Sequence, residues 1–333
     1  MILLIQNEVI KLLLKKKMIL IIFLLLIFIT LFSYGEKYAY DKNIKRLENL
    51  SGDMNYDWKS LANQRLKDLD KRLDSPYIPE GGISSIEIEI EQLNYFIEND
   101  INPITPSAAK FSVEFVEQGI LLFIPLLIVI LAADLVSGEF SSKTIKVLLT
   151  RAVPRWKILL SKFIALTMMT TILVFIIGVL STFVSFLFLQ RWGLNEPVAT
   201  GFSLIQGTLN SDYVVLVTRF QYMVLIYSLV WFVSIVLASI TLLISVIVNN
   251  TASAIGILMA ALISGQFLQF FLSDWTLVKY FFVTNLNLTH YLSGSYQVIE
   301  GMSLKFSIIL LSLWALLSLL ISFIVFNRED VLV

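Results

Sequence analysis

Long apolar runs dominate this sequence and, more than any other feature, restrict what it can fold into. Six runs have roughly the length, ~20 residues, that an α-helix needs to cross the hydrocarbon core of a bilayer. They occupy residues 18–34, 115–133, 163–189, 220–248, 251–272 and 305–326. Of all side chains, 57% are hydrophobic and only 15% are charged, which is typical of polytopic membrane proteins. We therefore predict an all-α polytopic membrane protein with six transmembrane helices.

The charged residues are segregated along the chain, and this predicts the orientation of the helices. Residues 134–162 carry six Lys or Arg and two acidic residues, whereas residues 36–117 carry ten basic and sixteen acidic residues. Short basic loops stay in the cytoplasm, and long loops are translocated whatever their charge. We expect residues 134–162 and both termini, including the tail 327–333, on the cytoplasmic side of the plasma membrane. Residues 36–114 are expected outside, and the separated charges do not indicate a nucleic-acid-binding protein.

Residues 1–17 have the pattern of an amphipathic helix that lies in the plane of the inner membrane surface. Asn7, Glu8, Lys11 and Lys15 share one narrow helical face, and apolar side chains cover the opposite face. A cleavable signal peptide is the alternative, because a basic segment precedes the first apolar run. The basic segment is long, however, and no small-residue cleavage site follows the run. We therefore favour a retained first span.

Residues 36–114 form the longest polar segment, and we expect a small, mostly helical extracellular domain there. An apolar stripe at helical spacing begins at Trp58, and Pro and Gly residues follow it. A second stripe begins near Ser84, which forms the sequence pattern of a capping box with Glu87. Residues 86–92 (IEIEIEQ) also alternate as a β-strand does, so a strand is the alternative for this stretch.

The other connections between the apolar runs differ in length and polarity. Residues 190–219 form a polar outer loop, whereas Asn249 and Asn250 form a very short inner turn. Residues 273–304 are too apolar for an ordinary loop. We expect short re-entrant or interfacial helices on the outer side there.

Groups for catalysis or ion transport are scarce in this sequence. The chain has no cysteine, which excludes disulfides, thiolate metal sites and cysteine nucleophiles. No ionisable residue lies in the apolar interior of the six runs, which disfavours proton-coupled transport and an intramembrane enzyme. The segment from Gly138 to Thr144 ends in Lys-Thr as a phosphate-binding loop does, but it lacks the second glycine. We therefore expect no metal, cofactor or ATP on this chain; its single histidine, His290, has no evident partner in the sequence.

The basic segment 134–162 also contains the pattern of a short amphipathic helix. Ser141 and Ser142 are candidate N-caps, and Pro154 ends the pattern. Three apolar residues share one face of this helix: Ile145, Leu148 and Leu149. Such a helix, placed across the cytoplasmic ends of two spans, is either a lever or a tether that only fixes orientation.

The same segment resembles the permease subunits of ABC exporters of the type-2 class. The matching residues are Glu139, Thr144, Leu148, Leu149, Thr150, Pro154, Arg155, Leu160, Lys162 and Ala165. The chain departs from that family at Lys143-Thr144, where the family usually has Gly-Thr. Outside this segment, the resemblance consists of the number and positions of the six apolar runs.

The resemblance implies that the segment is a coupling helix, which docks on a separate ATPase subunit that binds ATP. The docking contacts that it implies are Glu139, Lys143, Thr144, Ile145, Leu148, Leu149, Thr150 and Arg155. The implied function is that of the permease subunit of an ATP-driven exporter, paired with a second copy or with a sister permease. Ser, Thr and aromatic side chains in the spans fit either close helix packing or a path for an amphipathic, peptide, drug or lipid-like cargo. The alternative is a non-transporting membrane sensor or scaffold whose outer helical hairpin binds a ligand.

Overall fold

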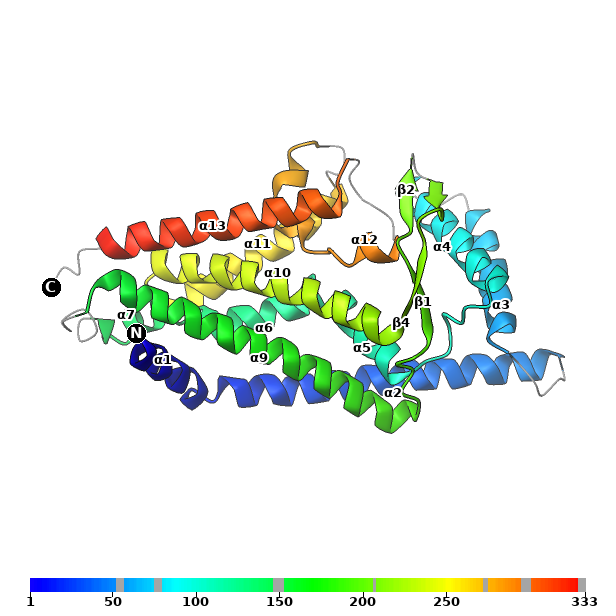
Figure 1. Cartoon of the computed structure of the whole chain (residues 1–333), viewed down its shortest axis with the longest axis horizontal. Helices are drawn as coiled ribbons and strands as arrows, with labels where there is room; N and C mark the ends of the chain where they lie inside the picture. Colours follow the sequence, from blue (N-terminus) through cyan, green and yellow to red (C-terminus); the bar gives the residue numbers. More distant parts are fainter. Residues whose placement is uncertain are drawn as a thin grey trace.

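The computed structural model of the chain describes residues 1–51, 57–74, 80–145, 153–205, 208–271, 275–294 and 301–328. The prediction of an all-α polytopic membrane protein is confirmed, because five described helices are long and apolar enough to cross a bilayer. These helices are α2 (Lys17–Ser51), α9 (Arg155–Leu189), α10 (Arg219–Ile247), α11 (Thr251–Phe271) and α13 (Leu304–Arg328). A bent pair of shorter helices makes a sixth crossing if it is counted as one span. The long helices run along the long axis of the molecule (Figure 1).

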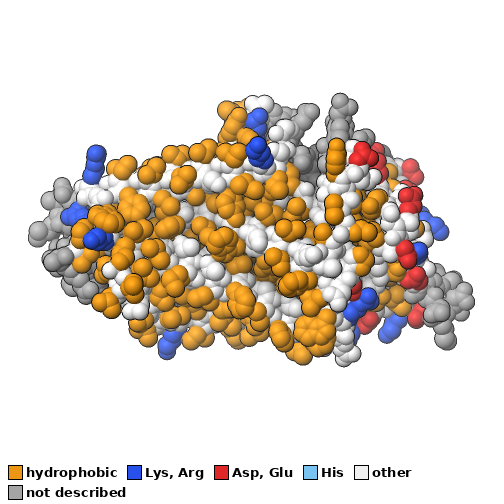
Figure 2. Space-filling model, viewed as in Figure 1, with side chains coloured by type: hydrophobic (Ala, Val, Ile, Leu, Met, Phe, Trp, Pro, Cys, Tyr) orange, Lys and Arg blue, Asp and Glu red, His pale blue; other side chains and the backbone are white. Residues whose placement is uncertain are grey.

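Helix α10 lies at the centre of the bundle, where it contacts α5, α6, α9, α11 and α13. The most apolar stretch of α10 is 67% buried inside the molecule, whereas the corresponding stretch of α13 is only 17% buried. A capping box starts α10: Thr218 Oγ1 accepts from the backbone N–H of Gln221, whose side chain accepts from the N–H of Thr218. Hydrophobic side chains cover the face of the bundle that Figure 2 shows, and acidic side chains gather at the end formed by α3 and α4. This distribution is expected of a bundle that faces lipid along most of its length.

The second span differs from the continuous helix expected at residues 115–133. It consists of α5 (Ala108–Gly119) and α6 (Phe123–Ala132), which meet at a bend of 69°. Pro125 explains the break, because its ring would clash with the carbonyl of Leu121 in a continuous helix and it has no N–H to donate. Gln266 of α11 compensates the break, since its Nε2 atom donates to Leu121 O at 2.9 Å.

The segment that precedes α2 forms α1 (Ile2–Leu14), which packs against α9 and α2. Lys16 separates α1 from α2 with a φ of +56°, a left-handed conformation that ends helices. Leu12 lies one helical turn after Glu8 and is fully buried in the main core, whereas Ile2, Leu3 and Leu13 are exposed. Helix α1 therefore forms part of the packed bundle in this structure.

A helical hairpin with its own small core lies at one end of the molecule. It consists of α3 (Trp58–Leu73), which Asp57 caps through a 2.7 Å bond to the N–H of Trp58, and α4 (Glu80–Glu98). The core is made of Ala62 and Leu69 of α3 and of Ile86 and Leu93 of α4.

Residues 86–92 are helical, so the strand alternative is wrong, and Ser84 lies inside α4 instead of capping it. The reason is tertiary, because the helical spacing of Ile86 and Leu93 brings both side chains onto α3. The side chains of Arg65 and Glu89 add a two-point ion pair across the hairpin, with distances of 2.7 and 3.2 Å.

The expected outer loop at residues 190–219 contains short strands. β1 (Pro197–Thr200) pairs antiparallel with β4 (Val215–Thr218), and β2 (Ser203–Ile205) pairs with β3 (Thr208–Asn210). β-Branched residues favour such pairing, and Val198 lies opposite Val217 in the register.

Short helices connect α11 to α13: η1 (Val278–Tyr280), η2 (Val283–Asn285) and α12 (His290–Ser293). They bury Val283, Leu286 and Leu288, which explains why this segment is more apolar than an ordinary loop.

Candidate functional site

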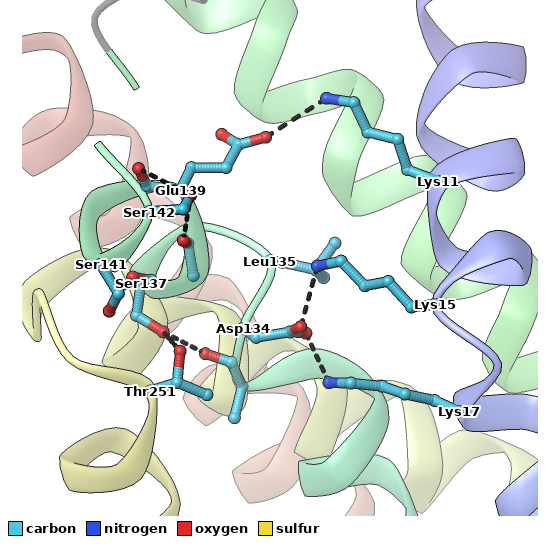
Figure 3. Close-up of polar contacts among 12 residues, drawn as sticks. Lys11, Lys15, Lys17, Asp134, Leu135, Ser137, Glu139, Ser141, Ser142 and Thr251 are labelled. Atoms are coloured by element: carbon cyan, nitrogen blue, oxygen red, sulfur yellow. Dashed lines mark hydrogen bonds and ion pairs between the residues drawn. The ribbon is translucent and has the colours of Figure 1, made fainter. Parts of the chain in front are cut away.

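Charged side chains from the helices α1, α2, α7 (Ser137–Ser141) and α9, and from two connecting segments, meet at one end of the bundle. We call this group the Lys162 network; its members are Glu8, Lys11, Lys15, Lys17, Asp134, Glu139 and Lys162. Spacings of three and four residues place Glu8, Lys11 and Lys15 on one face of α1, and that face lies against the network. Figure 3 shows the lysines of α1 and α2 directed at the carboxylates of Asp134 and Glu139.

Lys162 of α9 is the most deeply buried member of the network, with 1% of its side chain exposed. Its Nζ atom lies 2.7 Å from Glu139 Oε1 and 2.9 Å from Glu8 Oε2, and it donates to Leu135 O at 3.1 Å. These three acceptors match the three hydrogens of an ammonium group. Lys11 adds a second bridge between the same carboxylates, at 3.0 Å from Glu8 and 3.3 Å from Glu139.

Asp134 forms the second half of the network. Its carboxylate lies 2.8 Å from the Nζ atom of Lys15 and 2.8 Å from that of Lys17 (Figure 3). Lys17 also donates to Ile130 O at 2.8 Å, which satisfies a carbonyl in the last turn of α6. A cation at this position also interacts favourably with the dipole of α6.

The pKa values of three members of the network are shifted, each in the direction that favours the charged form. Burial alone raises the pKa of Glu8, but the charges and hydrogen bonds of Lys162 and Lys11 outweigh it and leave the pKa below its ordinary 4.5. Burial also raises the pKa of Asp134, and Lys15 and Lys17 bring it below its ordinary 3.8. Burial lowers the pKa of Lys11, but Glu8 and then Glu139 bring it above its ordinary 10.5. These three groups are therefore charged at neutral pH.

Hydroxyl groups attach α7 to the other side of the bundle. Ser245 Oγ of α10 donates to Ala133 O at 2.7 Å, and it accepts from the backbone N–H of Val136 and of Ser137 at 3.1 Å. Ser137 Oγ lies 3.2 Å from Thr251 Oγ1 at the start of α11 (Figure 3). Together with the Lys162 network, these bonds connect α7 to α1, α9, α10 and α11.

Helix α7 ends in a Schellman motif with lysine at the left-handed position. The N–H of Thr144 donates to Glu139 O at 2.9 Å, the N–H of Lys143 donates to Phe140 O at 3.0 Å, and Lys143 has a φ of +59°. Ser141 is the last residue of α7 and Ser142 is its C-cap, whereas the helix that they are expected to start extends beyond the described residues. The sequence pattern of helix starts does not distinguish the start of a helix from its end, since a Ser side chain also bonds to carbonyls one turn back, as Ser142 does to Gly138 O at 2.7 Å.

A family model described as "Protein of unknown function (DUF2705)" matches residues 89–332, which is more than half of the chain. The chain belongs to the DUF2705 family. Two Bacillus subtilis (strain 168) proteins are similar to it. The uncharacterized protein YhcI is 25% identical over 285 residues, which cover 84% of this chain and 87% of YhcI. The uncharacterized membrane protein YdbK is 28% identical over 209 residues, which cover 62% of this chain and 76% of YdbK.

The structure places the residues of the expected ATPase-docking site in different environments in this DUF2705 chain. Lys143 and Thr144 are exposed, whereas Glu139 belongs to the Lys162 network. Ile145 is 3% exposed and packs in the main core, so it cannot form part of an exposed apolar face. Arg155 donates to Asn327 O at 3.2 Å, next to the end of α13. The remaining residues, Leu148, Leu149 and Thr150, lie outside the described residues.

Most of the Lys162 network is absent from the docking residues expected from the sequence. Lys15 and Lys17 belong to the basic segment that precedes the first apolar run, and Asp134 and Lys162 delimit the basic segment 134–162. The sequence feature that could have indicated the network is the charged face of α1, where Glu8 is followed by Lys11 and Lys15, because it is complementary to a segment with both signs of charge. No three or more His, Asp or Glu side chains among the described residues are placed to hold a metal ion.

An open cavity of about 990 Å³ adjoins the network. Its walls include Lys11, Lys15 and Asp134 on one side and Ser142, Thr144 and Thr251 on the other. The network therefore lines the same accessible cavity as α7 and the turn that follows it.

The second span contains two glutamates in its first half: Glu117, which lies close to the start of the run 115–133, and Glu114, which precedes that run. Because α5 begins at Ala108, Glu114 and Glu117 lie inside the broken span, and the hydroxyl of Tyr222 donates to Glu117 Oε1 at 3.3 Å. An intramembrane carboxylate is a functional-site candidate by default.

Proposed function

We propose that this chain is the membrane-spanning permease subunit of an ATP-driven exporter, and that a separate ATPase subunit docks on α7 and the segment after it. The observation that carries the proposal is the Lys162 network, because the buried Lys162 pairs with Glu139 of α7 and Glu8 of α1, and the partly exposed Lys11 of α1 pairs with Glu139 as well. The bonds of Ser245 and Thr251 join α7 to α10 and α11 as well. The resemblance of residues 134–162 to type-2 ABC exporter permeases supports the same function.

This arrangement favours the lever over the tether. A tether needs only charge and length, whereas a lever has to move together with the helices that it drives. Buried ion pairs lose their favourable geometry when one partner moves alone, and an unpaired buried charge is costly. A displacement of α7 by the ATPase is therefore transmitted to α1 and α9.

The proposal assigns the expected docking residues to two roles. Lys143 and Thr144 are exposed and contact the ATPase, whereas Glu139 and Ile145 transmit the displacement within the chain. ATP is bound by the partner subunit. The exporter contains two permease chains, either two copies or one copy with a sister permease, in the plasma membrane with the termini in the cytoplasm. The cargo belongs to the amphipathic, peptide, drug or lipid-like compounds.

The test separates docking from coupling. The tagged chain is co-expressed with an ABC-type ATP-binding subunit encoded beside its gene, and co-purification and cargo-stimulated ATPase activity are both measured. Leu148→Asp should release the ATPase, because burying one Leu side chain contributes roughly 1.5–3 kcal/mol. Lys146→Ala is the matched control and should retain it, because an exposed ion pair contributes only ~0–1 kcal/mol.

Lys162→Met should keep the ATPase bound and abolish the stimulation of its activity, provided that the variant is folded. Two results would contradict the proposal: retention of the ATPase by Leu148→Asp at the wild-type level, or undiminished stimulation in Lys162→Met. Absence of any ATP-binding partner would leave the sensor or scaffold as the better explanation.

A further inference from the structure

A cleft of about 610 Å³ lies between α2, α5 and α6, at the point where the second span breaks. Five of its lining residues are phenylalanines: Phe28, Phe32, Phe111, Phe115 and Phe123. Their rings contact one another edge to face or stacked, for example Phe28 and Phe123 with centroids 5.1 Å apart and Phe115 and Phe123 at 5.8 Å. We call this site the aromatic cleft.

The aromatic cleft opens to the surroundings of the bundle. Phe32 is 53% exposed and Leu122, which lies in the break between α5 and α6, is 45% exposed. Irregular backbone at membrane depth is found where it is buried in protein or lines a cavity. The break therefore exposes a cavity on the side of the molecule that faces lipid, and a ligand dissolved in the membrane can reach it.

Two carboxylates line the same cleft. Glu36 of α2 makes no hydrogen bond or ion pair with any described side chain, and Glu114 of α5 has only Lys110, whose Nζ atom lies 3.6 Å away. Lys110 also donates to Ile104 O at 3.0 Å, and the nearby Arg219 pairs with Glu196 at 3.2 Å. The charge of Lys110 also acts on Glu36, but Lys110 pairs with Glu114 and donates to Ile104 O. Glu36 therefore lies beside an apolar wall without an ion-pair partner among the described residues.

This combination selects one class of ligand. An unpaired carboxylate in apolar surroundings is costly, and a positive charge beside it removes that cost. The faces of aromatic rings also attract cations. Ligand sites with apolar walls and a few placed polar groups bind most of a ligand through the walls and orient it through the polar groups. Both the carboxylate and the faces of the aromatic rings repel anions of the same shape.

We propose that the aromatic cleft binds an amphiphilic organic cation, with its apolar body against the phenylalanines and its positive charge at Glu36 and Glu114. The binding itself does not depend on the proposed transport function; only the statement that such a cation is cargo depends on it.

The experiment measures binding to the full-length chain in nanodiscs of neutral lipid, without ATPase or ATP. The probes are radiolabelled tetraphenylphosphonium and tetraphenylborate, which have nearly the same shape and opposite charge. Empty nanodiscs give the amount that partitions into lipid. The wild-type chain should bind tetraphenylphosphonium saturably and tetraphenylborate no more than the empty discs do.

Glu36→Gln should weaken tetraphenylphosphonium binding by about tenfold or more, because a charge-assisted contact is lost while the shape of the side chain is kept. Glu114→Gln is a second variant and should weaken binding in the same direction. Asp41→Asn is the matched control, because Asp41 is an exposed acidic residue of α2 outside the cleft, and it should bind as the wild type does. An unchanged thermal unfolding midpoint shows that each variant is folded.

Three results would overturn the inference: no saturable binding above the empty discs, equal binding of the two ions, or wild-type binding by both glutamine variants. Because no ATPase is present, this outcome is independent of the docking test. If the cation does not bind but the ATPase docks normally, the cleft is not a cation site and the permease function stands. If the cation binds but the ATPase does not dock, the permease function is wrong and the cation site stands.

Discussion

The Nζ atom of Lys162 lies 2.7 Å from Oε1 of Glu139, and the same ammonium lies 2.9 Å from Oε2 of Glu8. The Lys162–Glu8 pair joins residues 154 positions apart in the sequence. A lysine that is 1% exposed is tolerated only because two carboxylates and one carbonyl surround it. The position of α7 relative to α1 and α9 therefore depends on an ammonium group that is almost fully buried and on the two carboxylates that pair with it.

Removal of the central cation should destabilise the protein strongly. Lys162→Met keeps most of the length of the side chain but leaves Glu8 and Glu139 without their shared ammonium. Breaking one partner of a buried ion pair costs about 3–5 kcal/mol, so the unfolding midpoint of the purified protein should fall. Lys157→Met is the control on the same helix; its ammonium lies 5.4 Å from the Trp156 ring centroid, and its loss should cost no more than about 1 kcal/mol. Equal losses in the two variants would show that the Lys162 network contributes nothing specific.

The stability contributed by the network should depend on pH at both extremes. The folded-state pKa values of Glu8 and Asp134 are depressed, so their contribution is present above the ordinary values of 4.5 and 3.8 and is lost as the pH falls through the lower folded values. The pKa of Lys11 is raised, so its contribution is present below 10.5 and is lost as the pH rises through the higher folded value. Unfolding midpoints measured across this range should therefore form a plateau.

Asp134→Asn tests the acid side of that plateau. The variant should be less stable than the wild type at neutral pH, and its midpoint should fall less between pH 5 and the acid limit, because one titrating pair is gone. Asp68→Asn, at an exposed position of α3, is the control and should leave the acid limb unchanged. An acid limb of the same steepness in Asp134→Asn and the wild type would contradict the assignment.

The left-handed conformation of Lys143 predicts an unusual gain from glycine. Lys143→Gly should stabilise the turn after α7 by up to about 1 kcal/mol, because glycine has no Cβ to strain a φ of +59°. Lys143→Ala removes the same charge but keeps the Cβ, so it should not stabilise the protein. The comparison of unfolding midpoints therefore separates backbone strain from charge. Glycine is also the residue that type-2 exporter permeases usually have at this position.

The orientation in the membrane is tested with single cysteines, because the native chain has none. An impermeant thiol reagent should label Asn63→Cys of α3 in intact cells and should label Ser142→Cys only after the cells are opened. Both positions are exposed, so access to the side chain does not limit the reaction. Labelling of Ser142→Cys alone in intact cells would reverse the orientation predicted from the Lys and Arg distribution.

Local patterns in the sequence were sufficient to predict the helices, because each pattern reflects a requirement that the segment meets by itself. Apolar runs of bilayer length predict spanning helices, and the amphipathic spacing of residues 1–17 predicts a helix where α1 lies. The break of the second span was not predicted, although Pro125 is a sequence signal for it, because proline kinks or breaks a helix. The bond between Gln266 and Leu121 O has no signal in the sequence, because it depends on α11 lying beside the break.

The tertiary structure alone decided which charges meet. In the sequence, Glu8 indicates only a solvated helix face and Asp134 only topology, and the resemblance assigns Glu139 and Lys162 to a coupling segment, not to a shared ion pair. Coulomb pairing depends on distance in space, and no periodicity records it. The same reason explains why Ile145 was assigned to a docking face, although packing places it in the core, and why the sequence did not indicate a cation site. Glu36 and Glu114 are far apart in the chain, and only the packing of α2 against the broken span brings them to one cleft.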